Sequence, residues 1–248
     1  MMPKDRKMEE KLNALCVRVV DYKDSDRLIT LCTAEKGKIT VKATGVKKPK
    51  AKLKFASSPL CFGEYLVVNS NGRYTLKGCD IYDNFNNLVS DLNCYYAGFS
   101  VLEWLDKLSD TTDADTSRGL LLLAVRTLEK LSSDVAVAPE KTLISFLLSA
   151  LETVGYGLDF NRSAISGKNL ADRDAVCFDF YSGGVVDFPE RSMDYITFSR
   201  KDVGLMTGGE EGEKKDYDRL LADLGRITLF YTGVKKNYSL EEFLKLQY

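Results

Sequence analysis

The residues with the clearest chemical potential in this sequence are lysines, and they crowd one short segment. Eight lysines lie from Lys36 to Lys54, and no acidic residue occurs between Glu35 and Glu64. Ammonium groups gathered on one surface can contact nucleic-acid phosphates and release their condensed counterions, which drives binding. The candidate phosphate contacts are Arg18, Arg27, Lys38, Lys42, Lys47, Lys48, Lys50, Lys52 and Lys54. The alternative is a solvated loop that only keeps the protein soluble.

Binding of single strands also requires aromatic rings on which bases can stack. The candidates are Tyr22, Phe55, Phe62, Tyr65 and Tyr74. Because aromatic side chains supply much of the buried area of a core, each of these rings has a structural explanation as well.

The usual catalytic constellations of side chains are absent. The sequence contains no histidine, which removes the commonest general base and the commonest metal ligand. None of its six cysteines forms a C-x-x-C pair, so they indicate reduced, buried thiols rather than a zinc or redox motif. Clustered carboxylates at Asp172, Asp174 and Asp179 leave a metal-dependent hydrolase as a minor alternative. We therefore expect no enzyme, with no catalytic residue, metal or cofactor.

The charge is divided unevenly along the chain. Residues 1–80 carry 17 Lys and Arg against 9 Asp and Glu, a net of +8. The remaining residues carry 18 against 27, a net of −9. Such a division indicates that the N-terminal part meets a polyanion while the rest does other work.

The N-terminal part has the pattern of five short strands. They are expected at Leu12–Asp21, Arg27–Glu35, Ile39–Val46, Leu60–Asn69 and Arg73–Tyr82. Alternation of apolar and polar residues from Ile39 onward, and the Asn71-Gly72 step, are typical of strands and a tight hairpin. Five strands with an irregular basic connection between the third and fourth predict a small barrel of the OB type.

After Asp83 the apolar spacing becomes helical. Helices are expected at about 88–108, 116–133, 139–155, 214–232 and 239–246, with an acidic link at Ser109–Asp115. Between them, residues 159–190 are irregular and contain a strand-like stretch, Ala175–Tyr181. The predicted fold is α+β, with a nucleic-acid-binding barrel at 1–82 and a helical domain with a small β-containing insertion at 83–248.

Several stretches carry a resemblance to a known family. They are ALCVRVVDYKDSDRLITL at 14–31, EKGKI at 35–39, GVKKPK at 45–50 and the segment from Leu151 to Asp159. These stretches resemble the RecO family of recombination mediators. The resemblance implies an OB domain, a helical C-terminal domain and a role in recombinational repair. It also implies binding and annealing of single- and double-stranded DNA, and action with RecR and single-stranded DNA-binding protein to load a RecA-type recombinase.

The sequence departs from the family at a zinc module that many members carry. Ser163 and Ser166 have the spacing of its first C-x-x-C pair, and Asp187 and Glu190 stand where the resemblance places the second. Serine is a poor zinc ligand, so we predict an insertion that folds without metal.

The first hypothesis is thus a DNA-binding and annealing mediator without catalysis. The alternative is an OB-fold protein that binds RNA or the ribosome, because basic loops do not read the 2′-hydroxyl. In the acidic helical domain, Lys235 and Lys236 are candidate contacts for the acidic tail of a single-stranded DNA-binding protein. No membrane span or signal peptide is expected, so the predicted location is the cytoplasm, at the bacterial nucleoid.

Overall fold

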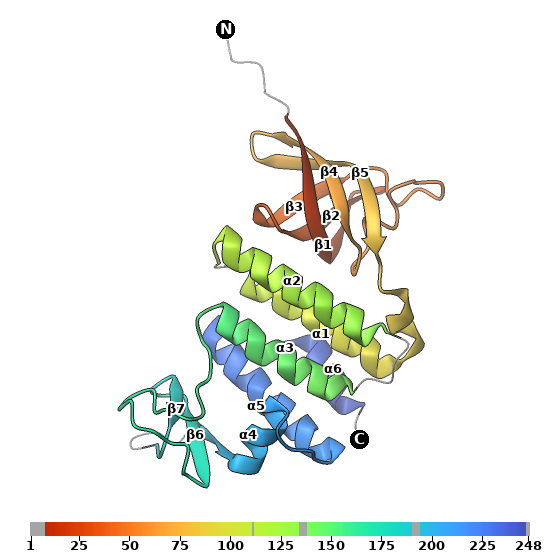
Figure 1. Cartoon of the computed structure of the whole chain (residues 1–248). Helices are drawn as coiled ribbons and strands as arrows, with labels where there is room; N and C mark the ends of the chain where they lie inside the picture. The colour runs from red at the N-terminus through yellow and green to blue at the C-terminus, as the bar shows by residue number, and fades with distance from the viewer. Residues whose placement is uncertain (1–7, 111, 134–137, 190–193, 247–248) are drawn as a thin grey trace. The chain divides into compact units, whose positions relative to one another are not determined.

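The structure is a computed structural model that describes residues 8–110, 112–133, 138–189 and 194–246 (Figure 1). The chain divides into two compact units, Met1–Val135 and Ala136–Tyr248. The first contains a closed β-barrel and two helices, and the second contains helices and a small sheet.

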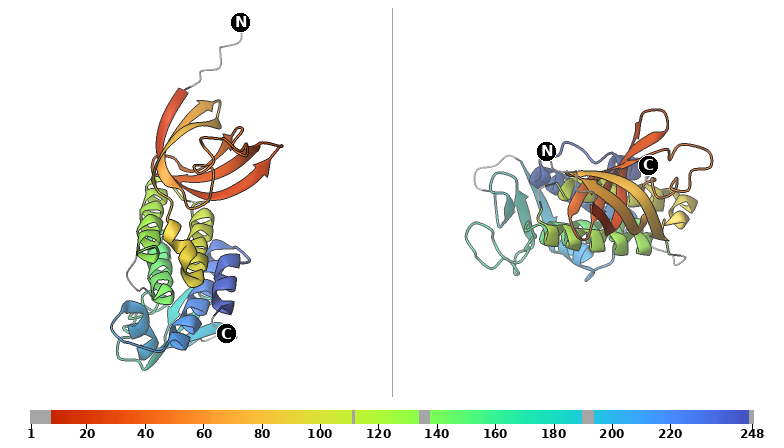
Figure 2. Two further views of the ribbon diagram at one scale, coloured as in Figure 1. Left: turned by 90° about the vertical axis from the view of Figure 1, so that its right-hand side faces the viewer. Right: turned by 90° about the horizontal axis from the view of Figure 1, so that it is seen from above.

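The barrel has five strands, as the sequence predicts. They are β1 (Met8–Tyr22), β2 (Asp26–Thr33), β3 (Gly37–Ala43), β4 (Phe62–Ser70) and β5 (Arg73–Asp83). Their order is β1-β2-β3-β5-β4, and β1 also pairs with β4. Strand β1 closes the barrel because its first half pairs with β4 and its second half with β2, with a register shift between Cys16 and Arg18. Figure 2 shows the strands curving around the interior. The prediction of an OB-type barrel is confirmed.

The barrel interior is filled by the inward side of the alternating strands. Ile29, Leu31 and Val41 are fully buried. Tyr65 is also fully buried, and its hydroxyl donates hydrogen bonds to the carbonyl oxygens of Ala56 and Cys61, at 3.1 Å each. Because the ring of Tyr65 belongs to the core, it cannot serve as a stacking platform.

The first two helices belong to the same compact unit as the barrel. They are α1 (Leu92–Leu108) and α2 (Ala114–Leu131), preceded by the 3₁₀ turn η1 (Asn86–Ser90). Helix α1 begins at Leu92, later than the start near residue 88 that the apolar spacing predicts. The reason is that the Asp91 side chain accepts the backbone N–H of Cys94 and caps the helix there. The sequence places a boundary after residue 82, where β5 ends, yet Arg118 of α2 donates to the carbonyl oxygen of Ala34 at 3.0 Å.

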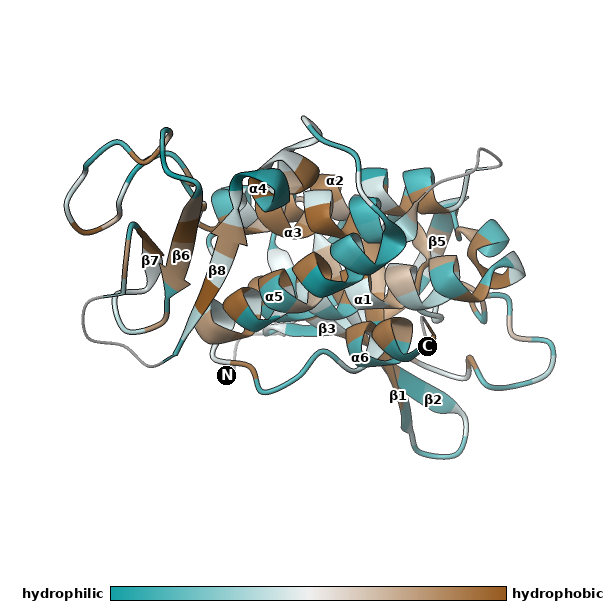
Figure 3. Cartoon of the chain, turned by 90° about the horizontal axis from the view of Figure 1, so that it is seen from below, coloured by the Kyte–Doolittle hydropathy of each residue, from teal (hydrophilic) through white to brown (hydrophobic). Residues whose placement is uncertain are grey.

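The second unit is built on helices α3 (Pro139–Thr153) and α5 (Lys214–Thr232), which pack against each other. Two short helices, α4 (Arg200–Thr207) and α6 (Tyr238–Lys245), accompany them. A three-stranded sheet has the order β7-β6-β8, from β6 (Ala175–Asp179), β7 (Gly184–Val186) and β8 (Tyr195–Ser199). Strand β6 is hydrophobic along most of its length (Figure 3), which agrees with the strand expected there. None of the helices described is long and apolar enough to cross a membrane.

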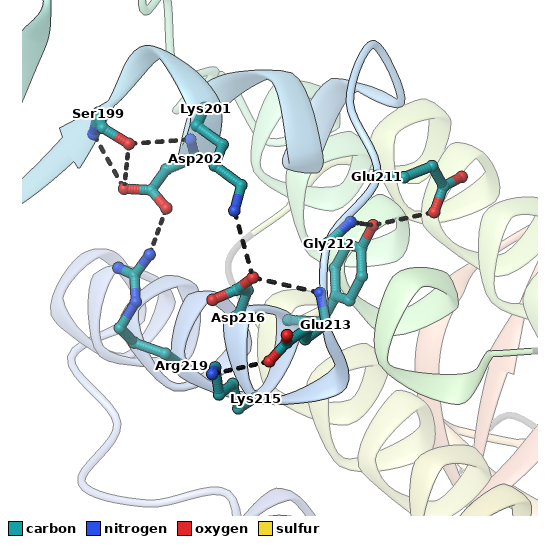
Figure 4. Close-up of polar contacts among 10 residues, drawn as sticks. Ser199, Lys201, Asp202, Glu211, Gly212, Glu213, Lys215, Asp216 and Arg219 are labelled. Atoms are coloured by element: carbon teal, nitrogen blue, oxygen red, sulfur yellow. Dashed lines mark hydrogen bonds and ion pairs between the residues drawn. The ribbon is translucent and has the colours of Figure 1, made fainter.

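Helix α4 and strands β7 and β8 were not expected from the sequence. Ser199 and Asp202 form a capping box at the start of α4, and this Ser-x-x-Asp spacing was the available signal. Figure 4 shows that Asp202 also binds Arg219 of α5, while Lys201 pairs with Asp216 at 3.7 Å. Since Asp202 of α4 pairs with Arg219 of α5, and Lys201 of α4 pairs with Asp216 of α5, this polar cluster joins the two helices and has a structural explanation.

Candidate nucleic-acid interface

Five of the predicted phosphate contacts lie on an ordered connection between β3 and β4, residues 44–61, which we call the lysine loop. They are Lys47, Lys48, Lys50, Lys52 and Lys54. The loop backbone forms successive turns, with N–H groups of Lys48, Ala51 and Lys54 bonded to carbonyl oxygens three residues earlier. Val46 and Ala56 are buried in the barrel core. The loop is therefore packed on the barrel by its apolar residues, which leaves its lysines facing outward.

Four lysines on the outer side of this loop have no side-chain hydrogen bond or ion pair within the part of the chain that the structure describes. They are Lys48, Lys50, Lys52 and Lys54, and all four are exposed. An unpaired ammonium can contact a phosphate without first breaking a protein contact. These four lysines are consequently the strongest candidates for the cationic surface.

Phe55 follows Lys54 directly and is 69% exposed. No ring contact of Phe55 is found among the described residues. An apolar ring held in water beside cations is the arrangement that single-strand binding proteins use for stacking. Phe55 is therefore the best placed of the five aromatic candidates.

Tyr22, at the end of β1, is a second exposed aromatic residue, but cations already lie against its ring. The ammonium groups of Lys23 and Lys42 lie 5.4 and 5.5 Å from its centroid. Lys23 was not among the predicted contacts, although its position beside Tyr22 was the available signal. A base that stacks on Tyr22 would have to displace one of these lysines.

The two other aromatic candidates are partly covered. Phe62 packs edge-on against Tyr82 with centroids 5.4 Å apart, and Tyr74 lies 5.9 Å from the ammonium of Lys36. Neither ring stands as free as that of Phe55.

Three further predicted cations, one in the loop and two on the neighbouring strands, are held by acidic residues. Lys47 pairs with Asp21 at 2.7 Å and Lys42 with Asp26 at 3.1 Å. The side chain of Arg27 is only 25% exposed and lies 3.4 Å from Asp21. Eight cations near the loop outnumber the three carboxylates Asp21, Asp24 and Asp26, so the surface stays cationic; the cations are Lys23, Arg27, Lys42, Lys47, Lys48, Lys50, Lys52 and Lys54.

These contacts lower the pKa values of the carboxylates that take part in them. The hydrogen bond and charge of Lys47, together with Arg27, lower the pKa of Asp21. The backbone N–H of Gly45, and then Lys42, lower the pKa of Asp26. Both groups are therefore firmly ionised near neutral pH.

Two predicted contacts lie elsewhere, where the barrel meets α1. Arg18 and Lys38 both pair with Asp106, at 3.5 and 3.0 Å, and Lys38 also binds Asp110. The side chain of Lys38 is 17% exposed. Burial alone would lower the pKa of Lys38, but its hydrogen bonds to Asp110 and Asp106 raise it above the ordinary value. Because the ammonium of Lys38 is held by two carboxylates and its side chain is largely covered, we do not include Lys38 in the proposed interface.

The insertion contains two tight turns, and the first of them holds Ser163 and Ser166, the residues that the family resemblance places at the first C-x-x-C pair. Ser163 Oγ accepts the N–H of Ser166 at 3.2 Å. In the second turn, the carboxylate of Asp179 accepts the N–H groups of Tyr181 and Ser182 at 3.3 and 3.1 Å. Hydroxyl and carboxylate oxygens thus supply acceptors within both turns, and the residues present do not fit a structural zinc site, which uses Cys or His.

The other residues named for metal chemistry are also spread apart or paired. Asp187 forms an ion pair with Arg173 at 2.8 Å, and Glu190 lies outside the described residues. Asp172 and Asp174 are exposed. Within the described ranges no group of three or more acidic or thiol side chains could hold a metal ion. The described residues therefore give the hydrolase alternative no geometric support.

Lys235 and Lys236 lie in the second unit, between α5 and α6. Lys235 is exposed, and Lys236 lies 3.5 Å from Glu241 and 5.8 Å from the ring centroid of Tyr238. Two neighbouring cations beside an exposed tyrosine could receive an acidic peptide that carries apolar side chains.

A closed five-stranded barrel with an ordered, cationic loop has the architecture of the OB-fold proteins. Comparison with known families narrows this class. The model described as "Recombination protein O N terminal" matches residues 8–85, and "Recombination protein O C terminal" matches residues 89–194. The chain belongs to the RecO family, and this membership supports a role in DNA repair and recombination.

Individual relatives agree. The chain is 30% identical to a DNA repair protein RecO of Clostridium novyi over 182 residues, which covers 73% of this chain and 70% of the relative. It is 28% identical to that of Clostridium kluyveri, covering 76% and 72%. It is 24% identical to a DNA repair protein RecO of Acetivibrio thermocellus over 254 residues, which covers 95% of this chain and 96% of the relative.

Proposed function

We propose that this protein is a recombination mediator that binds single- and double-stranded DNA through the lysine loop and anneals complementary strands. In this role it helps to load a RecA-type recombinase onto single-stranded DNA, and it acts without a catalytic step or a cofactor. Annealing requires no bond chemistry, because neutralising two backbones lowers the electrostatic barrier between them.

The observation that supports this proposal is the set of four unpaired, exposed lysines beside the exposed ring of Phe55. The lysines supply charge along a backbone, and the ring supplies a sequence-tolerant stacking surface. Arg27, Lys42 and Lys47 lie close by and extend the cationic surface, although carboxylates hold them in the free protein.

We propose partners of three kinds, on the resemblance to the RecO family. A RecR-like protein and single-stranded DNA-binding protein would act directly, and the recombinase indirectly. Lys235 and Lys236 are the proposed contacts for the acidic tail of the single-stranded DNA-binding protein. Binding to chromosomal DNA would place the protein at the nucleoid in the cytoplasm. A tail peptide that binds the Lys235→Glu/Lys236→Glu variant as tightly as the unchanged protein would contradict this assignment.

Strand annealing tests the proposed function directly. Two complementary oligonucleotides of about 20 nucleotides, longer than the roughly 4–16 that one OB fold covers, are mixed with the protein at several salt concentrations, with and without single-stranded DNA-binding protein. We expect faster duplex formation that weakens as salt rises. RNA strands of the same sequence form the comparison. A protein that accelerates only RNA pairing, or neither, is not the proposed mediator.

A further inference from the structure

A buried carboxylate helps to attach the first turn of the lysine loop to the barrel, beside the hydrogen bond that the N–H of Lys47 donates to the carbonyl oxygen of Ser25 at 3.1 Å. Asp26, the first residue of β2, is 6% exposed. Its Oδ1 accepts the backbone N–H of Gly45 at 2.8 Å, and its Oδ2 lies 3.1 Å from the ammonium of Lys42. Gly45 has a φ of 71°, a left-handed conformation that glycine adopts with little strain. Asp26 therefore holds the point at which the chain turns into the loop.

The part of the loop that follows Phe55 is bonded by the next residue of β2, Arg27. Arg27 Nη1 donates to the carbonyl oxygen of Ser57 at 3.0 Å, and its Nε lies 3.4 Å from Asp21 Oδ1. Ser57 is fully buried. Two consecutive residues of β2 thus contact both ends of a segment that carries the four exposed lysines and Phe55.

We propose that Asp26 and Arg27 are positioning residues, a loop clamp that holds the lysine loop in its DNA-binding conformation before DNA arrives. This inference rests on the proposed function of the loop. A loop that is ordered in the free protein loses less conformational entropy on binding, and this gain appears as affinity.

The sign of the effect at Asp26 separates a clamp from simple electrostatics. Asp26 is an acidic residue close to a cationic surface, so its removal would strengthen DNA binding if charge alone mattered. The loop clamp predicts weaker binding. Asp24 is the matched control, since it is exposed and makes no side-chain contact within the described part of the chain.

The experiment uses the full-length chain and a fluorescent single-stranded DNA. Affinity is measured against salt for the unchanged protein, Asp26→Ala, Asp26→Asn and Asp24→Ala. We expect Asp26→Ala to bind about tenfold more weakly at every salt concentration, since re-ordering a loop and a few lysine side chains costs about this factor. The salt dependence stays the same because the phosphate contacts are unchanged. Asp26→Asn retains an acceptor for the N–H of Gly45 and recovers most of the affinity, and Asp24→Ala binds equally or slightly more tightly.

Arg27→Lys provides a second variant should Asp26→Ala not fold. It preserves the charge, but a lysine cannot reach Ser57 and Asp21 together. The clamp therefore predicts weaker DNA binding, whereas charge alone predicts no change in affinity. Amide hydrogen exchange without DNA gives an independent readout. Exchange at Gly45 rises in Asp26→Ala, and exchange around Ser57 rises in Arg27→Lys.

Tighter or unchanged DNA binding by Asp26→Ala and Arg27→Lys, with unchanged loop exchange, overturns the clamp. Failure of the proposed function looks different, because the unchanged protein then binds no DNA while loop exchange still rises in the variants.

Discussion

Neutralising the four unpaired lysines is the most direct perturbation of the interface. The variant Lys48→Ala/Lys50→Ala/Lys52→Ala/Lys54→Ala removes four of the five lysines near the loop that have no ion pair among the described residues, and it leaves Lys23, whose ammonium lies against the ring of Tyr22. Five phosphate contacts give a log–log salt slope of about −3.5 for a single strand, and one gives about −0.7. Raising salt from about 50 to about 200 mM should then weaken DNA binding by the unchanged protein about 100-fold, but DNA binding by the variant only about threefold. At the higher salt the variant should bind about 100-fold more weakly.

Fluorescence anisotropy with a labelled single strand measures both quantities. The control removes the same charge from exposed lysines and an arginine outside the loop, in Lys77→Ala/Arg126→Ala/Lys130→Ala/Lys168→Ala. Circular dichroism verifies that both variants fold. The reasoning is refuted if the loop variant retains the slope and affinity of the unchanged protein, or if the control variant loses as much.

Four further outcomes are expected. Phe55→Ala should weaken single-strand binding by about 1–3 kcal/mol without changing the salt slope, as expected for a lost stacking contact, and an unchanged affinity would exclude that role. Lys38→Met should lower the free energy of unfolding by about 2 kcal/mol, because Asp110 loses the ammonium of Lys38 and Asp106 keeps only Arg18. Denaturant titration followed by Trp104 fluorescence can measure this loss, and an unchanged free energy would argue against the pairing. Burial and the charge of Glu140 raise the pKa of Asp218 above 3.8, so its ionisation costs stability as pH rises through the folded pKa. Asp218→Asn should therefore raise the free energy of unfolding at pH 7 by roughly 1 kcal/mol, which is measured as a higher melting temperature. This gain should disappear below about pH 4. A chelator should leave the melting temperature unchanged, and stoichiometric zinc in the purified protein would contradict the zinc-free insertion.

Much of the fold was predictable because its signals are local. The alternation that begins at Ile39 and the Asn71-Gly72 turn specify strands through neighbouring residues alone. Likewise, Pro139 begins α3 and a helix was expected over residues 214–232, where α5 lies. The small elements of the second unit escaped prediction, because α4 and β7 are too short for their periodicity to be distinct.

The site was predictable only as a composition. The sequence identified the cationic segment, but a lysine has the same letter whether it faces solvent or a carboxylate. Lys38 alternates with its neighbours as an outward strand residue would, yet Asp106 and Asp110, about 70 residues further along, approach it from α1.

The sequence by itself determined the fold class and the position of the cationic segment, because a strand pattern and a run of lysines are both properties of residue order and type. Only the tertiary structure decided which cations are free, which aromatic ring is exposed and which side chains hold the loop. Those properties depend on contacts between residues far apart in the chain, such as Arg27 with Ser57. Their free energies arise from burial and pairing, which exist only after the barrel has closed.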